Sequence, residues 1–293
     1  MRAWILGSGG PYPSWGLRRA SSGYLIKMPD SYLLFDHGFG SHQRMLELGV
    51  SATDISHIFI SHLHYDHIGD LPRLVLTRWN EDESTDLEIY GPPPIARVVK
   101  SFFGESGPYG PDLTARTESE VNRHKWTSKG GSGIRPRPTP KVEELSAGIV
   151  VEHKDWKMSC AFGNHHSPHL ICLAYRLEHN GQSLVYSGDT APTENIINLA
   201  TDCDVLIHMC SYITGTEPSA AWRESNSGHL ELAKAAAAAR PKCLVLTHLG
   251  RYDAPGLRER VVSEMSQIYS GKIVLGEDLL EVPFGQQSKA FDW

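Results

Sequence analysis

Four side chains that can bind a metal lie within one short run of the chain, namely His62, His64, Asp66 and His67. Neutral imidazole and carboxylate are the ligands that divalent metals such as zinc take in proteins. A lone histidine here would be read most simply as a solvated polar residue at a strand end. Four donors at this density indicate a metal site instead.

The spacing within the run predicts where these donors point. His62 and His64 are two residues apart, so in an extended segment their side chains lie on the same side. Asp66 and His67 follow where the chain has begun to turn, and they can face a second position. Two metals held close together can share a hydroxide at neutral pH. The pattern therefore favours a dinuclear site.

The flanking sequence indicates the elements that must position this run. Residues 55–60 are apolar and rich in β-branched side chains, which is typical of a strand, and a helix is expected from residue 68. The donors should therefore lie on the turn that leaves a strand, where a rigid scaffold presents loop residues. The glycine-rich run 7–10 lacks the Gly-Lys-Ser/Thr of a phosphate loop, so we expect a tight turn that brings backbone close to the site.

Further candidate donors also lie at the ends of predicted strands. Asp189 and His248 each follow an apolar stretch that reads as a strand, and His165 and His166 precede another at residues 170–177. A carboxylate has two oxygens, so Asp189 is suited to bridge two cations. We expect these distant residues to join the run at 62–67.

These motifs carry a resemblance to a known family. Residues 59–72 read Phe-Ile-Ser-His-Leu-His-Tyr-Asp-His-Ile-Gly-Asp-Leu-Pro and resemble the His-x-His-x-Asp-His signature of the metallo-β-lactamase superfamily, most closely in its ribonuclease Z-like branch. Ser-Gly-Asp-Thr at 187–190 and Leu-Thr-His-Leu at 246–249 are similar to two further motifs of that superfamily. The motifs are specific in combination and weak apart.

The resemblance covers nearly the whole chain and implies its fold. It implies an α/β, four-layer αββα sandwich, in which two mixed sheets pack face to face with helices outside. We expect a single domain over residues 1–293, built from two halves at about 1–103 and 148–284.

The resemblance also implies roles for individual residues. It implies seven metal ligands in two sets with one shared bridge: His62, His64 and His165 for one metal, Asp66, His67 and His248 for the other, and Asp189 between them. Pro168 and the run Leu-Ala-Tyr-Arg at 173–176 match the family pattern and select His165, which we expect to be the ligand; an alignment from Tyr175 without the proline selects His166 as the alternative. Asp36 is expected to hydrogen-bond a ligand histidine and fix its ring. His229 is expected to donate a proton to the leaving group, and Asp66 is counted with it as catalytic.

Residues 104–141 show no clear periodicity and many glycines and prolines. We predict a long loop insertion here. Between residues 116 and 141 the chain has seven Lys or Arg and two Glu, so the insertion is locally basic. A basic lid beside the site would attract an anionic substrate. A plain solvated loop is the alternative.

Composition limits the class of protein. The chain has 293 residues, a formal net charge of −6 and 40% hydrophobic residues, which suits a globular domain and argues against one that wraps nucleic acid over its whole surface. No apolar run approaches the roughly 20 residues of a membrane span. The five cysteines are scattered without a Cys-x-x-Cys, as expected of reduced thiols in a cytoplasmic protein.

The function expected from the motifs and the resemblance is that of a dinuclear metal hydrolase. Zinc is the expected metal, although manganese and iron also suit these donors. The expected substrate is a phosphodiester or a related anionic ester, either a small molecule or a nucleic acid. One alternative is a carbonyl substrate such as a lactone, thioester or β-lactam, and another is a non-catalytic binding relative. No membrane partner is expected, and the resemblance implies a possible homodimer.

Overall fold

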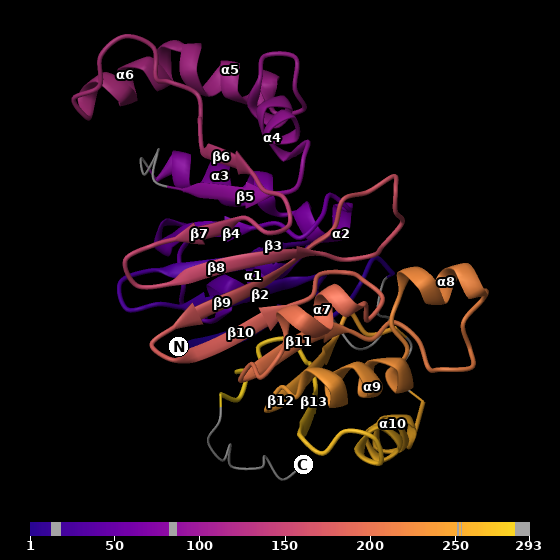
Figure 1. Ribbon diagram of the computed structural model, residues 1–293. Coiled ribbons are helices and arrows are strands. Elements are labelled where there is room, and N and C mark those ends of the chain that lie inside the picture. The colour runs from indigo at the N-terminus through magenta and orange to yellow at the C-terminus, as the bar shows by residue number, and fades with distance from the viewer. Residues whose placement is uncertain (13–18, 82–86, 251, 253, 285–293) are drawn as a thin grey trace.

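Two β-sheets packed face to face form the centre of the protein, with helices on their outer sides (Figure 1). The computed structural model describes residues 1–12, 19–81, 87–250, 252 and 254–284. This arrangement confirms the predicted α/β fold with two mixed sheets and outer helices.

The first sheet is built by the N-terminal half. Its six strands are hydrogen-bonded in chain order: β1 (Arg2–Gly7), β2 (Gly23–Lys27), β3 (Tyr32–His37), β4 (Ile55–Phe59), β5 (Glu88–Gly91) and β6 (Lys141–Glu144). The first three strands are antiparallel and the pairs from β3 to β6 are parallel. The accompanying helices are α1 (Ser41–Glu47), a 3-10 turn (Ala52–Asp54), α2 (Tyr65–Ile68), α3 (Leu71–Asn80) and α4 (Ile95–Phe103).

The second sheet is built by the C-terminal half. Its order is β13 (Lys272–Leu275), β12 (Cys243–Thr247), β11 (Val205–Met209), β10 (Gln182–Tyr186), β9 (Leu173–His179), β8 (Lys157–Phe162) and β7 (Val150–Glu152). The strands from β10 to β13 are parallel and those from β7 to β10 are antiparallel. Its helices are α7 (Glu194–Leu199), α8 (Ala220–Ser225), α9 (His229–Ala239) and α10 (Leu257–Ser266).

Alternation along the strands explains the layers. On β3, Leu33 and Phe35 pack in the core between the sheets, whereas Leu34 packs against the helices outside. On β11, Val205 and Leu206 divide in the same way between the inner core and the outer helices. Because successive side chains of a strand point to opposite faces, a continuous apolar strand buries both of its faces.

Both sheets have parallel strands whose carboxyl ends collect candidate donors. Strand β3 ends at Asp36 and His37, and β4 leads directly into the donor run at 61–67. Loops that follow the carboxyl ends of parallel strands are where α/β proteins place their sites. The fold therefore brings the predicted donors towards one edge.

The prediction of a long loop over residues 104–141 is wrong for much of that segment. Residues Gly110–Glu118 form α5 and Glu120–Ser128 form α6, and β6 completes the edge of the first sheet. Helix α6 buries none of its residues, so it lacks the apolar period that would reveal a helix in the sequence.

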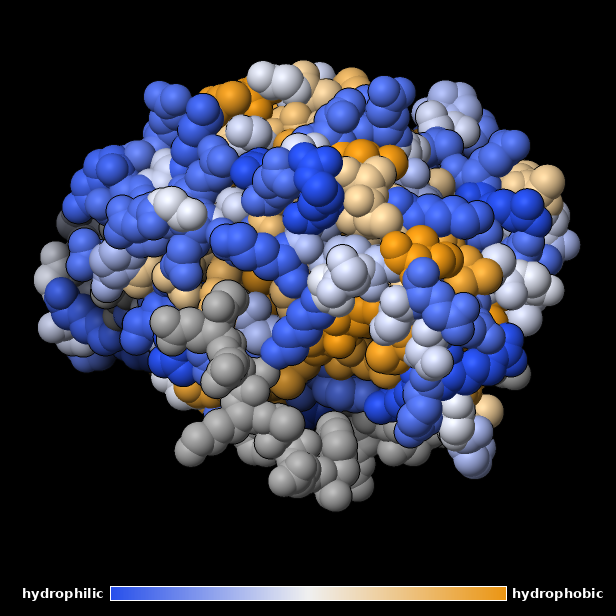
Figure 2. Space-filling model, turned by 60° about the horizontal axis from the view of Figure 1, so that its bottom comes forward, coloured by the Kyte–Doolittle hydropathy of each residue, from blue (hydrophilic) through white to orange (hydrophobic). Residues whose placement is uncertain are grey.

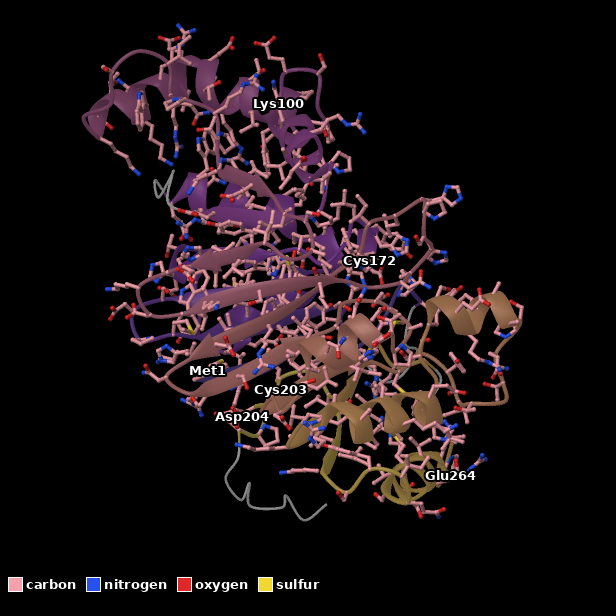
Figure 3. All side chains as sticks on the ribbon, viewed as in Figure 1. Met1, Lys100, Cys172, Cys203, Asp204 and Glu264 are labelled. Atoms are coloured by element: carbon pink, nitrogen blue, oxygen red, sulfur yellow. The ribbon has the colours of Figure 1, made fainter. Side chains whose placement is uncertain are left out.

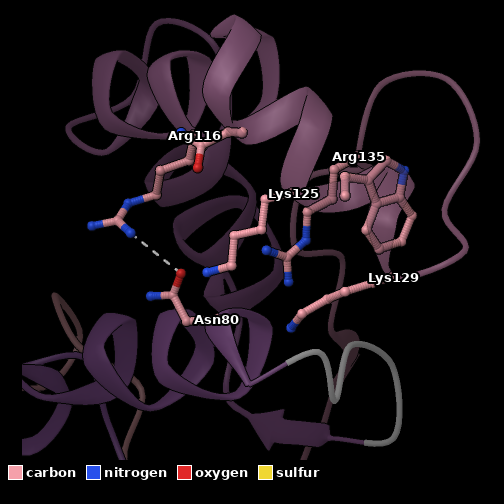
Figure 4. A pocket seen from close by; sticks show the side chains of 7 residues that line it. Asn80, Arg116, Lys125, Lys129 and Arg135 are labelled. Carbon is pink, nitrogen blue, oxygen red and sulfur yellow. Dashed lines mark hydrogen bonds between the residues drawn. The ribbon is translucent and has the colours of Figure 1, made fainter.

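Four of the seven basic side chains of this segment line a pocket against the C-terminal end of α3 (Figure 4). Its lining residues are Asn80, Arg116, Asn122, Lys125, Trp126, Lys129 and Arg135. Helix α3 spans ten residues, or roughly 15 Å, and the donor run precedes its start. The pocket therefore lies at the far end of α3 from the donors, and not beside them as a basic lid would require.

The surface and the cysteines agree with the composition. Hydrophilic residues predominate around the face in Figure 2, with hydrophobic residues grouped near its centre.

The five cysteines are free and buried. Burial raises the pKa of the Cys210 thiol to about 12, so it stays protonated at neutral pH. None of the helices in the described part of the chain has the length and hydropathy needed to cross a bilayer.

Phe59→Ala should destabilise the protein by about 3–5 kcal/mol, because it opens a cavity between the sheets. The Phe59 ring is fully buried, with centroids 4.9 Å from Tyr90 and 5.5 Å from Tyr175. Equilibrium urea unfolding would measure the loss. Val121→Ala on α6 is the control, since Val121 is 79% exposed and should change stability by less than about 0.5 kcal/mol. Equal losses in the two variants would contradict the assigned core.

Candidate metal centre

The run after β4 brings its two nearest histidines together. His64 has an extended backbone and immediately precedes α2. The His62 Nε2 and His64 Nδ1 atoms lie 3.0 Å apart. The two rings converge on one side, as the two-residue spacing predicts for an extended segment. His64 is the half-buried member of the donor groups, so the site is most open on its side.

His165 and Asp189 complete the first group of donors. One ligand atom from each of His62, His64, His165 and Asp189 lies within 4.8 Å of the others. The distance from His165 Nε2 to Asp189 Oδ2 is 3.8 Å. His166 lies outside this group, exposed and with a φ of 51°. Of these two candidate histidines, the structure brings His165 to the other donors.

Asp66, His67 and His248 form the second group, and Asp189 reaches it as well. The His248 Nε2 atom lies 3.3 Å from Asp66 Oδ2 and 3.0 Å from Asp189 Oδ2. The His67 Nε2 atom lies 3.6 Å and 3.5 Å from the same two oxygens. One oxygen of Asp189 is therefore a near neighbour of both groups.

Asp36 lies behind the donors and accepts four hydrogen bonds. They come from the Ser61 backbone N–H and hydroxyl, each at 2.7 Å, the Tyr186 hydroxyl at 2.6 Å and His67 Nδ1 at 2.7 Å. The Ser61 oxygen, having given its proton to Asp36, accepts from His62 Nδ1 at 3.0 Å. This series of hydrogen bonds places a proton on Nδ1 of both rings. The Nε2 atom of each ring then faces the donor groups and is the one available to a metal.

The donor set fits a pair of divalent cations. Bonds of about 2.0–2.1 Å to a tetrahedral cation place neighbouring ligand atoms about 3.3 Å apart, close to the separations of 3.0–3.8 Å found here. The His67 Nε2 atom is buried and lacks a hydrogen-bond partner among the described residues. His165 Nδ1 donates to the Ser225 carbonyl at 2.8 Å, so its Nε2 also keeps a lone pair for a metal. A buried polar atom without a hydrogen-bond partner is costly unless a cation meets it.

Comparisons with known proteins agree with this geometry. The family model described as "Beta-lactamase superfamily domain" matches residues 31–249. Ribonuclease Z of Haloferax volcanii is 30% identical over 319 residues, covering 97% of this chain and 96% of the relative. Ribonuclease Z of Mycobacterium sp. (strain KMS) is 29% identical over 292 residues, covering 95% and 94%.

This chain belongs to the β-lactamase superfamily. Within it the chain is ribonuclease Z-like, which makes it a metal-dependent hydrolase. The crystal structure of human tRNase Z, short form, has a TM-score of 0.67 at 19% identity, covering 98% of this chain and 100% of that one. The metallo-β-lactamase fold protein YhfI from Bacillus subtilis gives 0.73 at 20%, covering 96% and 98%. These two likenesses support the fold.

The candidate ligand histidines differ in the direction in which their surroundings shift the pKa. Burial lowers the pKa of His165 to about 4 and holds that of His62 well below its usual range. Burial would also lower the pKa of His248, but Asp189 and Asp66 outweigh it and raise the pKa to about 9. Burial likewise opposes protonation of His67, but Asp189 and Asp36 raise its pKa well above the usual value. These shifts favour protonation of His248 and His67 at neutral pH, whereas the lowered pKa of Asp66 keeps its carboxylate ionised.

His229 does not join the donors. It begins α9, and its Nε2 donates to Glu264 on α10 at 2.7 Å (Figure 3 labels Glu264). Its Nδ1 accepts from the Thr214 backbone N–H at 3.0 Å. Both ring nitrogens are engaged within the protein, so this geometry does not support the expected proton transfer from His229 to a leaving group.

Several supporting residues were missed in the sequence because they act only through the fold. Ser225 accepts from His165, and Tyr186 donates to Asp36, across long stretches of the chain that no local motif connects. Ser61 lies within the motif, but its link from Asp36 to His62 is seen only in the structure. From the sequence, Gly10 is only one residue of a glycine-rich turn. A Cβ there would lie 2.5 Å from the His248 ring, so only glycine lets the turn approach.

Asp36→Asn should weaken metal binding by about 10- to 100-fold, because one amide oxygen cannot accept four hydrogen bonds. Chelator competition on purified protein would measure the affinity. The matched control is Asp204→Asn, whose carboxylate accepts from the Ser183 backbone N–H and Lys242 and lies at the other end of the second sheet (Figure 3). Metal binding by Asp36→Asn as tight as that of the control would argue against the supporting role.

Binding of a divalent metal should release protons at pH 7.5, because His248 and His67 must lose theirs before they can act as ligands. The apparent affinity should therefore rise as the pH increases from 7.5 through about 9, the pKa of His248. Calorimetry of zinc binding in buffers of different ionisation enthalpy would count the protons. A proton count of zero at pH 7.5 would contradict this charge state.

Proposed function

We propose that this protein is a dinuclear zinc hydrolase that cleaves phosphodiesters. His62, His64 and His165 would hold one ion, Asp66, His67 and His248 the other, and Asp189 would bridge them. The observation that carries the proposal is the shared Asp189 oxygen, 3.0 Å from His248 Nε2 and 3.8 Å from His165 Nε2. When bound, the two cations supply an activated water and neutralise charge at the reacting centre. Manganese and iron suit the same donors.

The residues of the chain supply orientation and charge. Asp36 fixes His67 directly and His62 through Ser61, so one ligand in each group is held in the correct tautomer. Burial would raise the pKa of Asp189, but His248 and His67 hold it well below the usual value, so this carboxylate stays ionised. Asp66, whose oxygen is 3.3 Å from His248, has its remaining carboxylate oxygen to accept a proton or position a water.

The substrate class rests on the relatives. Proteins named ribonuclease Z match over nearly their whole length, and RNA is a phosphodiester polymer. RNA or a smaller phosphodiester is therefore the substrate we propose, in place of a lactone, thioester or β-lactam. The complete set of seven donors argues against a non-catalytic relative, in which ligands could be lost without penalty. The homodimer stays a prediction from the resemblance.

Asp189→Ala should abolish both metal retention and turnover, because it removes the oxygen common to the two groups. We expect the wild-type protein, loaded with zinc and assayed for metal content, to cleave bis(p-nitrophenyl) phosphate and a precursor tRNA. A lactone and a β-lactam serve as carbonyl controls. Cleavage of the carbonyl compounds alone would reverse the choice of substrate, and an active, metal-free Asp189→Ala variant would refute the assignment of the site.

A further inference from the structure

Two exposed aromatic rings lie beside the second group of donors. Tyr65 stands between His64 and Asp66 in the chain and is 58% exposed. Phe39, which follows β3, is 51% exposed, and its ring centroid lies 6.1 Å from that of Tyr65 at an interplanar angle of 47°. Large aromatic side chains are usually withdrawn from water, so a pair exposed together at a site is informative.

The Phe39 ring is held in place rather than loosely exposed. A Cβ on Gly69 would lie 2.7 Å from three atoms of that ring, so the ring lies against a bare stretch of backbone. Gly69 has an ordinary helical φ of −61°, and its backbone conformation does not demand glycine. The Phe39 carbonyl also accepts from the Ser21 N–H at 2.9 Å. The absence of a side chain at Gly69 therefore leaves the space that the Phe39 ring occupies.

A hydrogen bond anchors the Tyr65 side chain. Its hydroxyl donates to the Pro11 carbonyl at 3.2 Å. The preceding residue, Gly10, lies against the His248 ring. Tyr65 is thus anchored to a turn that contacts one donor, and it is covalently joined to His64, the donor nearest the opening. The two exposed rings therefore lie at the edge of the donor run, on the side of the half-buried His64.

We infer that Phe39 and Tyr65 form a stacking shelf for a nucleobase next to the scissile phosphate, an inference that rests on the proposed function. Planar bases stack on exposed aromatic side chains, and such contacts tolerate any base because every base has a π-face. The substrate is then a nucleotide phosphodiester with an unpaired base at the cleavage point. A phosphodiester that lacks a planar group would lose this contact.

Abasic substrates test the shelf. Two short single-stranded RNAs would be compared, identical except that the nucleotides flanking one cleavable phosphodiester carry bases in one and are abasic in the other. The wild-type zinc enzyme should cleave the base-bearing RNA with a kcat/KM about tenfold higher. Phe39→Leu should bring this ratio close to one, mainly by raising KM for the base-bearing RNA, and should leave the abasic rate unchanged.

Two further variants complete the design. Phe39→Tyr keeps a ring on Gly69 and should keep the preference, and Val121→Ala, which removes an exposed apolar side chain far from the site, should behave as wild type. An equal loss on both RNAs in Phe39→Leu, or an unchanged ratio, would overturn the shelf. Metal content measured in each variant would show whether an equal loss comes from the donors.

Failure of the proposed function would look different. If the wild type cleaves neither RNA, the phosphodiesterase assignment fails, and the shelf is then judged by calorimetry with a nucleoside 5′-monophosphate and ribose 5-phosphate. Tighter binding of the nucleotide in wild type, lost in Phe39→Leu, would support the shelf. Equal binding of the two ligands would overturn it.

Discussion

The buried carboxylate of Asp36 is the constraint on which the candidate site depends. It is fully enclosed and has a left-handed backbone, with a φ of 51°. Burying a charge is costly unless every oxygen is hydrogen-bonded, and four donors meet this one. One donor, Tyr186, belongs to the second sheet, so the carboxylate also joins the two halves of the sandwich.

This one anion orients a ligand in each donor group. It holds His67 directly and His62 through the Ser61 hydroxyl. The tautomers of both rings follow from this chain of donors and acceptors, and so does the direction of their free nitrogens. Preorganisation of this kind means that metals would find the ligands already in place, and little conformational entropy would be lost on binding.

The side chains around the metal centre differ in how close they lie to its donors. His64 is the half-buried donor, and Tyr65, which follows it in the chain, packs with Phe39 at a centroid distance of 6.1 Å. The basic pocket of α5 and α6 lies at the distant end of α3. His229 is paired with Glu264 on the neighbouring helix, so it stabilises the contact between α9 and α10.

Much of the fold could be predicted from the sequence because its strands are continuous apolar runs bounded by turns. Strand β12 is of this kind, and it leads into His248. Helix α6 could not be predicted, because it has no buried face to impose a period. The preference for His165 over His166 came from the resemblance, since the chemistry of two neighbouring histidines is the same, and the structure places His165 with the other donors.

The sequence by itself determined which atoms are available to a metal, and the spacing of residues 62–67 determined that they would face two positions. Only the tertiary structure decided that His165 enters the first group, that one Asp189 oxygen lies near both groups, and that His229 is engaged elsewhere. The physical reason is that these relations join side chains from different strands and helices. Their distances are set by the packing of the two sheets, and no local pattern encodes that packing.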